Sequence, residues 1–144
     1  MWLPARQALG VDIPASTTRD IGAGGRFTKD IDLVVDDSPG NVARVKQGLA
    51  VLADNAAAEV GDEDVRQHVV VRVADEVVVD LMGRACGVGY EEAARDVELI
   101  ERQGVSIPVA SPRTLIRLKD TPRPQDALDR AYLEGVLRAR AGRA

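Results

Sequence analysis

The stretch FTKDIDLVVDD, residues 27–37, places two aspartates at the start of an apolar run. Asp30 and Asp32 are separated by one residue and lead into Leu33, Val34 and Val35, a pattern typical of a core strand. Because residues i and i+2 of a strand point to the same face, the two carboxylates are expected side by side. Neighbouring carboxylates repel each other, and burial increases the cost. The pair therefore needs a physical reason.

A third aspartate stands in a second apolar run. The segments Val69–Val73 and Val77–Leu81 predict a β-hairpin, and Asp80 lies in the second of them. If that strand lies beside residues 30–35, Asp80 faces the first two acids, and three clustered carboxylates favour a hard divalent cation, Mg²⁺ or Mn²⁺. Spacing alone leaves a second interpretation open. In it, the first pair caps a turn and Asp80 faces solvent.

The remaining patterns predict further helices and one more hairpin. A helix follows Ser38 and Pro39, with Ser38 as a candidate N-cap. Its buried stripe comprises Val42, Val45, Leu49 and Leu52. A second hairpin is expected around residues 103–104, and Ser111 is expected to cap a helix with Leu115 and Leu118 facing inward.

These elements together predict one α+β domain over residues 1–144. It would hold a mixed, twisted sheet of about 4–5 strands flanked by helices, with C-terminal helices within residues 111–141. A final helix is expected over residues 125–140. Residues 1–27 are rich in small and polar residues without sustained periodicity, and are expected to form loop with at most a short helix.

Composition excludes several classes of protein. The net charge of −4 and an aromatic content of 3% argue against a general nucleic-acid binder with base-stacking platforms. Cys86 is alone, which excludes a disulfide framework and a cysteine-based zinc site. The sequence contains neither a signal-peptide pattern nor an apolar stretch long enough to span a membrane. We therefore expect a cytoplasmic protein without a membrane partner.

The segment RFTKDIDLVV, followed by EVVVDLM, resembles the DNA polymerase β-like nucleotidyltransferase superfamily. The similarity is to its minimal and AbiEii-type toxin members, and it covers roughly residues 22–140. In that family, two acids on one strand and a third on a neighbouring strand bind two metal ions. The resemblance implies a nucleotidyltransferase-like fold, with Asp30, Asp32 and Asp80 as the catalytic, metal-binding acids.

The late segment SPRTLIRLKDTPRPQDALDRAYLEGVL is also similar to that family. There a helical lysine precedes a helix with the pattern Arg-x-x-Asp-x-x-Asp. The match assigns Lys119 to the lysine and Arg123, Asp126 and Asp129 to the helix, where they would support the site. Lys119, together with Arg26 ahead of the first acids, would balance nucleotide phosphate charge; a carboxylate contact for Lys119 is the alternative.

The sequence departs from the family at its beginning. The family has an opening strand and then Gly-Gly at a helix start, about fourteen residues before the first aspartate, where backbone N–H groups bind the triphosphate. At that spacing this chain has Ala15, Ser16 and Thr17, without an evident strand before them. Either Ser16 and Thr17 bind phosphate in place of the glycines, or the site handles nucleotide poorly.

The leading expectation is a metal-dependent nucleotidyltransferase that moves NMP from an NTP to a hydroxyl on RNA, such as tRNA, or on protein. Such an enzyme could be the toxin half of a toxin–antitoxin pair. The alternative is a catalytically degenerate relative that serves as a binding or assembly module. A third interpretation is a homo-oligomer, or a complex whose partner completes the site.

Overall fold

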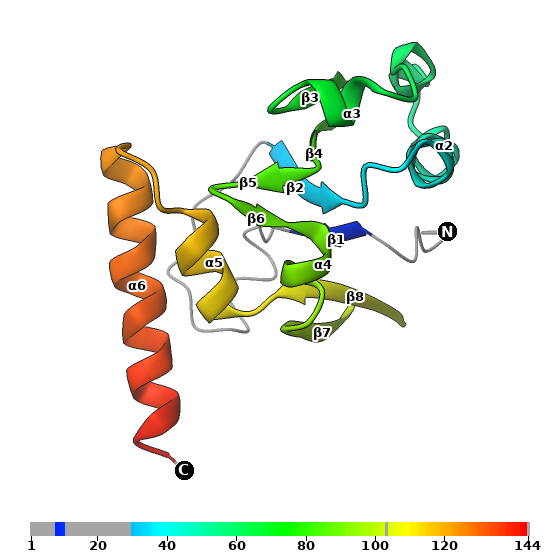
Figure 1. Ribbon diagram of the computed structural model, residues 1–144. Coiled ribbons are helices and arrows are strands. Elements are labelled where there is room, and N and C mark those ends of the chain that lie inside the picture. The colour runs from blue at the N-terminus through cyan, green and yellow to red at the C-terminus, as the bar shows by residue number, and fades with distance from the viewer. Residues whose placement is uncertain (1–7, 11–29, 103, 144) are drawn as a thin grey trace.

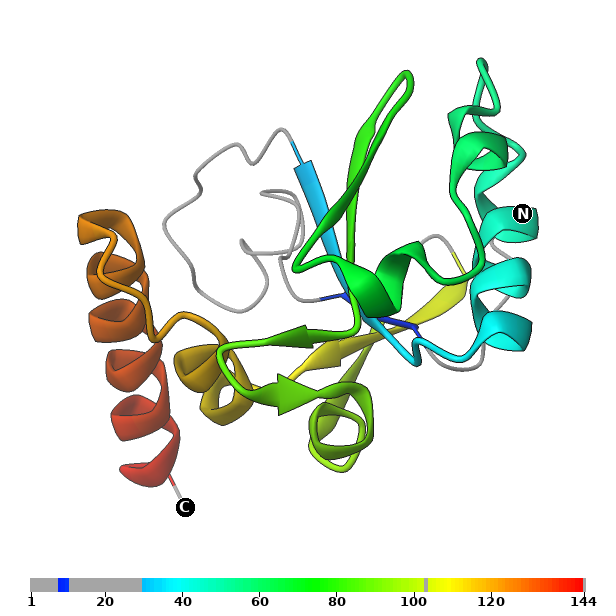
Figure 2. The same ribbon diagram turned by 45° about the horizontal axis from the view of Figure 1, so that its top comes forward.

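The computed structural model describes residues 8–10, 30–102 and 104–143. Figure 1 shows strands at the centre of the molecule, and Figures 1 and 2 both place helices α2 and α6 on opposite sides of them. Three of the predicted nucleotide-binding residues, Ser16, Thr17 and Arg26, lie outside the described residues.

The described residues form an α+β arrangement of eight strands, five α-helices and one 3₁₀ helix. In chain order the elements are β1 (Ala8–Gly10), β2 (Asp30–Val35), α2 (Pro39–Leu49), η1 (Ala56–Glu59), α3 (Asp64–Gln67), β3 (Val71–Ala74), β4 (Val78–Met82), β5 (Arg84–Ala85), β6 (Val88–Gly89), α4 (Tyr90–Ala93), β7 (Val97–Arg102), β8 (Val105–Ala110), α5 (Pro112–Leu118) and α6 (Pro124–Ala141).

Six of the described strands form one mixed sheet in the order β3-β4-β2-β1-β8-β7. Strands β2 and β4 are parallel, whereas the hairpins β3–β4 and β7–β8 are antiparallel. The short strand β1 joins the two halves, because it pairs with β2 on one side and with β8 on the other. The predicted mixed sheet is confirmed, but its expected size of 4–5 strands was too small.

Strand β1 also corrects the prediction that residues 1–27 form only loop with at most a short helix. A strand of three residues is too short to show an alternating pattern in the sequence. Its backbone groups are satisfied by pairing with strands that lie far away in the chain. A strand therefore precedes Ala15, where the sequence showed none.

The two faces of the sheet carry different hydrophobic clusters. Alternate residues of β2 point to opposite faces, so Leu33 and Val35 pack with Val42, Val45 and Leu49 of α2, whereas Val34 joins the cluster around α4 and α5. Asp30 and Asp32 share the alternation of Val34 and therefore lie on its face. The acids thus stand on the side of the sheet that the C-terminal helices cover.

The two predicted Ser-Pro helix starts are confirmed in position and differ in chemistry. Both Ser38 and Ser111 occupy the N-cap position, and each is followed by a proline in the first turn. The Ser111 side chain accepts a hydrogen bond from the Thr114 N–H at 3.2 Å, whereas that of Ser38 makes no capping hydrogen bond among the described residues. At Ser38 it is the backbone N–H that is bonded, to the Asp36 carboxylate at 2.8 Å.

Two further expectations are confirmed with small shifts. The first hairpin uses residues 71–74 and 78–82, so Val69 and Val70 precede it and are exposed. The second hairpin pairs Arg102 with Val105, so its two strands meet where the sequence predicted. None of the helices in the described residues is both long enough and apolar enough to cross a membrane.

Candidate functional site

Strands β2 and β4 bring the three predicted acids to one place in the sheet. Asp32 and Asp80 are register partners in the parallel pair, which puts their Cα atoms about 4.8 Å apart. Asp30 precedes Asp32 on the same face by one alternation. Asp80 is 8% exposed, whereas Asp30 and Asp32 are partly exposed. The adjacency that the sequence analysis assumed is therefore present.

Arg72 on β3 lies against these acids. It is the register partner of Asp80 in the antiparallel hairpin, so both side chains share a face. Its Nε donates to Asp80 Oδ1 at 2.9 Å and its Nη2 donates to Asp80 Oδ2 at 2.7 Å, which makes the pair bidentate. The same Nη2 donates to Asp30 Oδ2 at 3.1 Å. We call Asp30, Asp32, Asp80 and Arg72 the carboxylate cluster.

The acids hold the guanidinium of Arg72 firmly in its charged form. The hydrogen bonds to Asp80 raise the pKa of Arg72, and so do the charges of Asp80, Asp30 and Asp32, although desolvation opposes them. The sequence analysis missed this residue. Its signal was a single arginine inside the apolar segment VVVRV, at the position that the hairpin register places opposite Asp80.

The carboxylate cluster contains the ligand type that hard divalent cations prefer, but not, among the described residues, the grouping that holds one. Three carboxylates and one guanidinium carry a net charge of −2, and carboxylate oxygens are preferred ligands of Mg²⁺. In the part of the chain that the structure describes, however, no three Asp, Glu, His or Cys side chains are grouped so that they could hold a metal ion. The Arg72 guanidinium bridges Asp30 and Asp80 instead.

The predicted residues of the late segment form a second cluster at the junction of α5 and α6. Lys119 Nζ lies 3.1 Å from Asp129 Oδ2 and 3.9 Å from Asp126 Oδ1. Arg123 Nε donates to Asp126 Oδ2 at 2.7 Å, and the Thr121 hydroxyl donates to the same carboxylate. We call Lys119, Thr121, Arg123, Asp126 and Asp129 the junction cluster. Lys119 therefore contacts neighbouring carboxylates, the alternative to a phosphate contact.

Asp126 is the buried centre of the junction cluster, with 3% of its surface exposed. Burial acts to raise the pKa of Asp126, but the hydrogen bonds from Thr121 and Arg123 and the charges of Arg123 and Lys119 outweigh it and leave that pKa lowered. The carboxylate thus remains ionised because its partners replace the water it loses. This chemistry suits a residue that joins two helices.

Arg123 connects the two clusters electrostatically. Its hydrogen bond with Asp126 and the charge of Asp126 raise the pKa of Arg123, desolvation lowers it, and the charge of Asp32 raises it further by a smaller amount. The side chain of Arg123 is 74% exposed and is therefore not confined by packing. The start of α6 consequently presents a positive charge on the side of the molecule where Asp32 lies.

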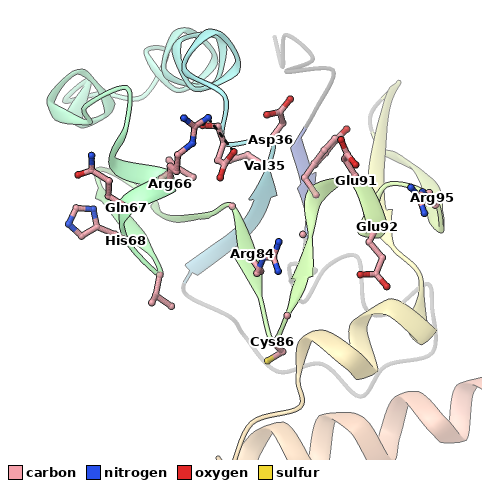
Figure 3. Close-up of a pocket in the computed structure, with 17 residues that line it drawn as sticks. Val35, Asp36, Arg66, Gln67, His68, Arg84, Cys86, Glu91, Glu92 and Arg95 are labelled. Atoms are coloured by element: carbon pink, nitrogen blue, oxygen red, sulfur yellow. Dashed lines mark hydrogen bonds and ion pairs between the residues drawn. The ribbon is translucent and has the colours of Figure 1, made fainter.

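A polar cavity of about 890 Å³ lies beyond the carboxyl end of β2, at Val35 and Asp36, and contains none of the predicted site residues. Figure 3 shows that charged side chains of both signs surround it, including Asp36, Arg84 and Glu92. Glu92 is itself paired with Arg117 at 2.5 Å. The mixture of charges in this cavity gives no preference for an anionic or a cationic ligand.

The described part of the site thus unites Asp30, Asp32 and Asp80, adds Arg72, and places Lys119, Arg123, Asp126 and Asp129 in a separate cluster next to it. No protein family matches the chain, and no curated protein matches it either.

Proposed function

We propose that this protein is a metal-dependent nucleotidyltransferase with a nucleotidyltransferase-like fold. The observation that carries the proposal is the parallel register of β2 and β4, which sets Asp32 beside Asp80 with Asp30 on the same face. Acids in this arrangement repel one another unless positive charge lies among them. The resemblance of the motif segments to the DNA polymerase β-like superfamily supplies the reaction class.

Asp30, Asp32 and Asp80 would hold Mg²⁺ or Mn²⁺. The bound ions would stabilise negative charge on the attacking and leaving oxygens of an in-line displacement at the α-phosphate of an NTP. Asp80, the most buried of the three acids, would also help to accept the proton of the acceptor hydroxyl. Arg123 and Arg26 would balance phosphate charge, because Lys119 is already paired with Asp129.

The acceptor would be a hydroxyl on RNA or protein, and transfer of NMP to it would release pyrophosphate. Modification of an essential acceptor such as tRNA is the chemistry of a toxin, so we include the toxin half of a toxin–antitoxin pair in the proposal. A protein that co-purifies with the chain and suppresses transfer would support that role.

A transfer assay tests the proposal. The purified protein would be incubated with Mg²⁺ or Mn²⁺, each of the four α-labelled NTPs, pooled tRNA and whole-cell protein. Label should appear with the wild type and not with Asp32→Ala. Asp120→Ala is the matched control, because Asp120 is 72% exposed and pairs with Arg130 away from the carboxylate cluster. Equal labelling by Asp32→Ala would reject the assignment of the site.

The alternative function is a non-catalytic binding or assembly module. The bridge from Arg72 to Asp80 and Asp30 favours it, because the guanidinium offsets part of the acidic charge without a metal ion. In that case the wild type would neither transfer NMP nor bind Mg²⁺·NTP in calorimetry. Binding without transfer would instead point to a missing acceptor.

A further inference from the structure

The polar cavity of about 890 Å³ lies outside the carboxyl ends of the parallel strands β2 and β4. Asp36 and Asp37 directly follow β2, and Gly83 and Arg84 directly follow β4. All four residues line the cavity. Its volume lies in the range that is usual for the binding sites of small molecules.

The chain leaves these two strands toward opposite faces of the sheet. After β2 it enters α2, whose Val42 and Val45 pack on the same face as Leu33. After β4 it passes through the β5–β6 hairpin into α4, whose Ala93 packs on the other face with Val34. Where neighbouring parallel strands send their connections to opposite faces, a crevice opens between the connections, and this is where open sheets bind ligands. The topology therefore places a binding site at this cavity.

Three arginines surround one glutamate at one end of the cavity. Arg117 Nη1 donates to Glu92 Oε1 at 2.5 Å, and this hydrogen bond is the largest of the effects that lower the pKa of Glu92. The charges of Arg117, Arg95 and Arg84 lower that pKa further, although desolvation opposes them. These four side chains carry a net charge of +2. Because guanidinium groups bind planar carboxylates well, this end suits a carboxylate of a ligand.

Two carboxylates lie toward the other end of the cavity. Figure 3 shows Glu91 and Glu92, which are neighbours in α4, extending in opposite directions, with Glu91 on the side of Asp36. The charge of Asp36 acts on the start of α4, because it adds to the effect of burial in raising the pKa of Tyr90. Among the described residues, neither Asp36 nor Glu91 forms an ion pair. This end therefore suits a cationic group of a ligand.

We propose that the cavity binds a small zwitterion, with its ammonium group at Asp36 and Glu91 and its carboxylate at Arg84 and Arg95. The four acids that line the cavity are matched in number by its three arginines together with Arg117. Charge therefore favours neither a simple anion nor a simple cation, and its separation into two ends favours a ligand that carries both. Free amino acids and short peptides share this chemistry.

The test measures binding of alanine and of trialanine to the full chain, by calorimetry and by chemical-shift titration in NMR. At least one of the two probes should bind and shift the amide resonances of Gly83, Gly87 and Gly89, which line the cavity. N-acetylation of that probe removes its positive charge and C-terminal amidation its negative charge, so each should weaken binding by about tenfold or more. Preference for alanine or for trialanine identifies the amino acid or the peptide as the source of the zwitterion.

Arg84→Gln and Glu91→Gln each remove the charge of one end, and each should weaken binding of the same probe by about tenfold. Both residues are exposed, so the fold should tolerate either change. Arg138→Gln and Glu134→Gln are the matched controls, because these exposed residues pair with each other on α6 and do not line the cavity. They should change the affinity by less than about twofold.

Three results would overturn the proposal. They are no binding of either probe, binding that both blocking groups leave unchanged, and equally tight binding of inorganic phosphate. Since the assay contains neither a metal ion nor a nucleotide, its outcome is independent of the proposed transfer activity.

Discussion

The carboxylate cluster and the junction cluster are built from the same side-chain types and differ in how their charges are matched. The junction cluster has two acids, Asp126 and Asp129, and two bases, so its charged side chains balance. The carboxylate cluster has three acids and one base, with Arg72 59% exposed. The charged members of the junction cluster therefore sum to zero, whereas the four residues of the carboxylate cluster sum to a charge of −2.

This difference separates structural from functional charge. A buried carboxylate whose hydrogen bonds and charges are all met contributes to stability, and the removal of its charge is costly. A group of acids with a net negative charge loses stability through mutual repulsion, and groups of this kind are common at functional sites. Substitutions in the carboxylate cluster should therefore reduce activity more than stability. Substitutions in the junction cluster should reduce stability more than activity.

The largest expected effect is on catalysis, from Asp80→Asn. The substitution keeps the shape of the side chain and removes a charge of the proposed metal site, so transfer should fall by about a thousandfold or more, equivalent to about 4 kcal/mol. The free energy of unfolding should change by less than about 1 kcal/mol, because relief of repulsion offsets the lost pair with Arg72. Labelled-nucleotide transfer and urea unfolding measure the two quantities. An Asp80→Asn variant that is stable and retains full transfer activity would contradict the functional role of the carboxylate cluster.

The largest expected effect on stability comes from Asp126→Ala. It removes the shared acceptor of the Thr121 hydroxyl and the Arg123 Nε at the buried centre of the cluster, and should lower the free energy of unfolding by about 3 kcal/mol. Asp120→Ala serves as the control, since its exposed pair with Arg130 is worth at most about 1 kcal/mol. Urea denaturation compares the two variants with the wild type. Similar small losses in both would mean that the junction cluster is not structural.

The lowered pKa of Asp126 predicts a dependence of stability on pH. Because the folded pKa lies below the unfolded value of about 3.9, the stabilisation is fully present above that value. It is lost as the pH falls through the folded pKa. Asp126→Asn lacks this contribution, so its free energy of unfolding should fall less steeply than that of the wild type below about pH 4. The free energy of unfolding of both proteins would be measured by urea denaturation at several pH values. An equally steep fall with decreasing pH in both would contradict the lowered pKa of Asp126.

The smallest expected effect compares the two Ser-Pro helix starts. Ser111→Ala removes the bond to the Thr114 N–H and also the 2.5 Å bond that Ser111 donates to Asp96, and should cost about 1 kcal/mol or more. Ser38→Ala removes no side-chain capping bond, and should change the free energy of unfolding by less than about 0.5 kcal/mol. Thermal and urea unfolding of both variants provide the measurement, and equal losses would show that the two caps are equivalent.

Much of the local structure followed from the sequence because its signals are local. The apolar run after Asp32 predicted β2 with the bounds that the structure has, and the spacing of Val42, Val45 and Leu49 predicted the buried face of α2. The segments on either side of residues 74–76 predicted the hairpin that carries Asp80. Alternation and helical periodicity alone were sufficient for these elements.

Alternation and helical periodicity do not predict which distant strands pair with each other. The parallel register of Asp32 with Asp80, the strand β1 and its link to β8 all depend on backbone hydrogen bonds between residues far apart in the chain. The same holds for the difference between Ser38 and Ser111. Both sequences are Ser-Pro, and the surrounding structure decides that the Ser111 hydroxyl accepts from a helix N–H whereas at Ser38 the backbone N–H donates to Asp36.

The sequence by itself determined which residues carry charge on apolar strands, namely Asp30, Asp32, Arg72 and Asp80. Only the tertiary structure decided that Arg72 lies between two of these acids, because β3, β4 and β2 have to stand side by side before a guanidinium can reach across them. Likewise, the sequence supplied Lys119, Arg123 and Asp126, and the packing of α5 against α6 made them one cluster. Electrostatic interactions at this range depend on position in space, which is why the chain order alone could not assign the partners.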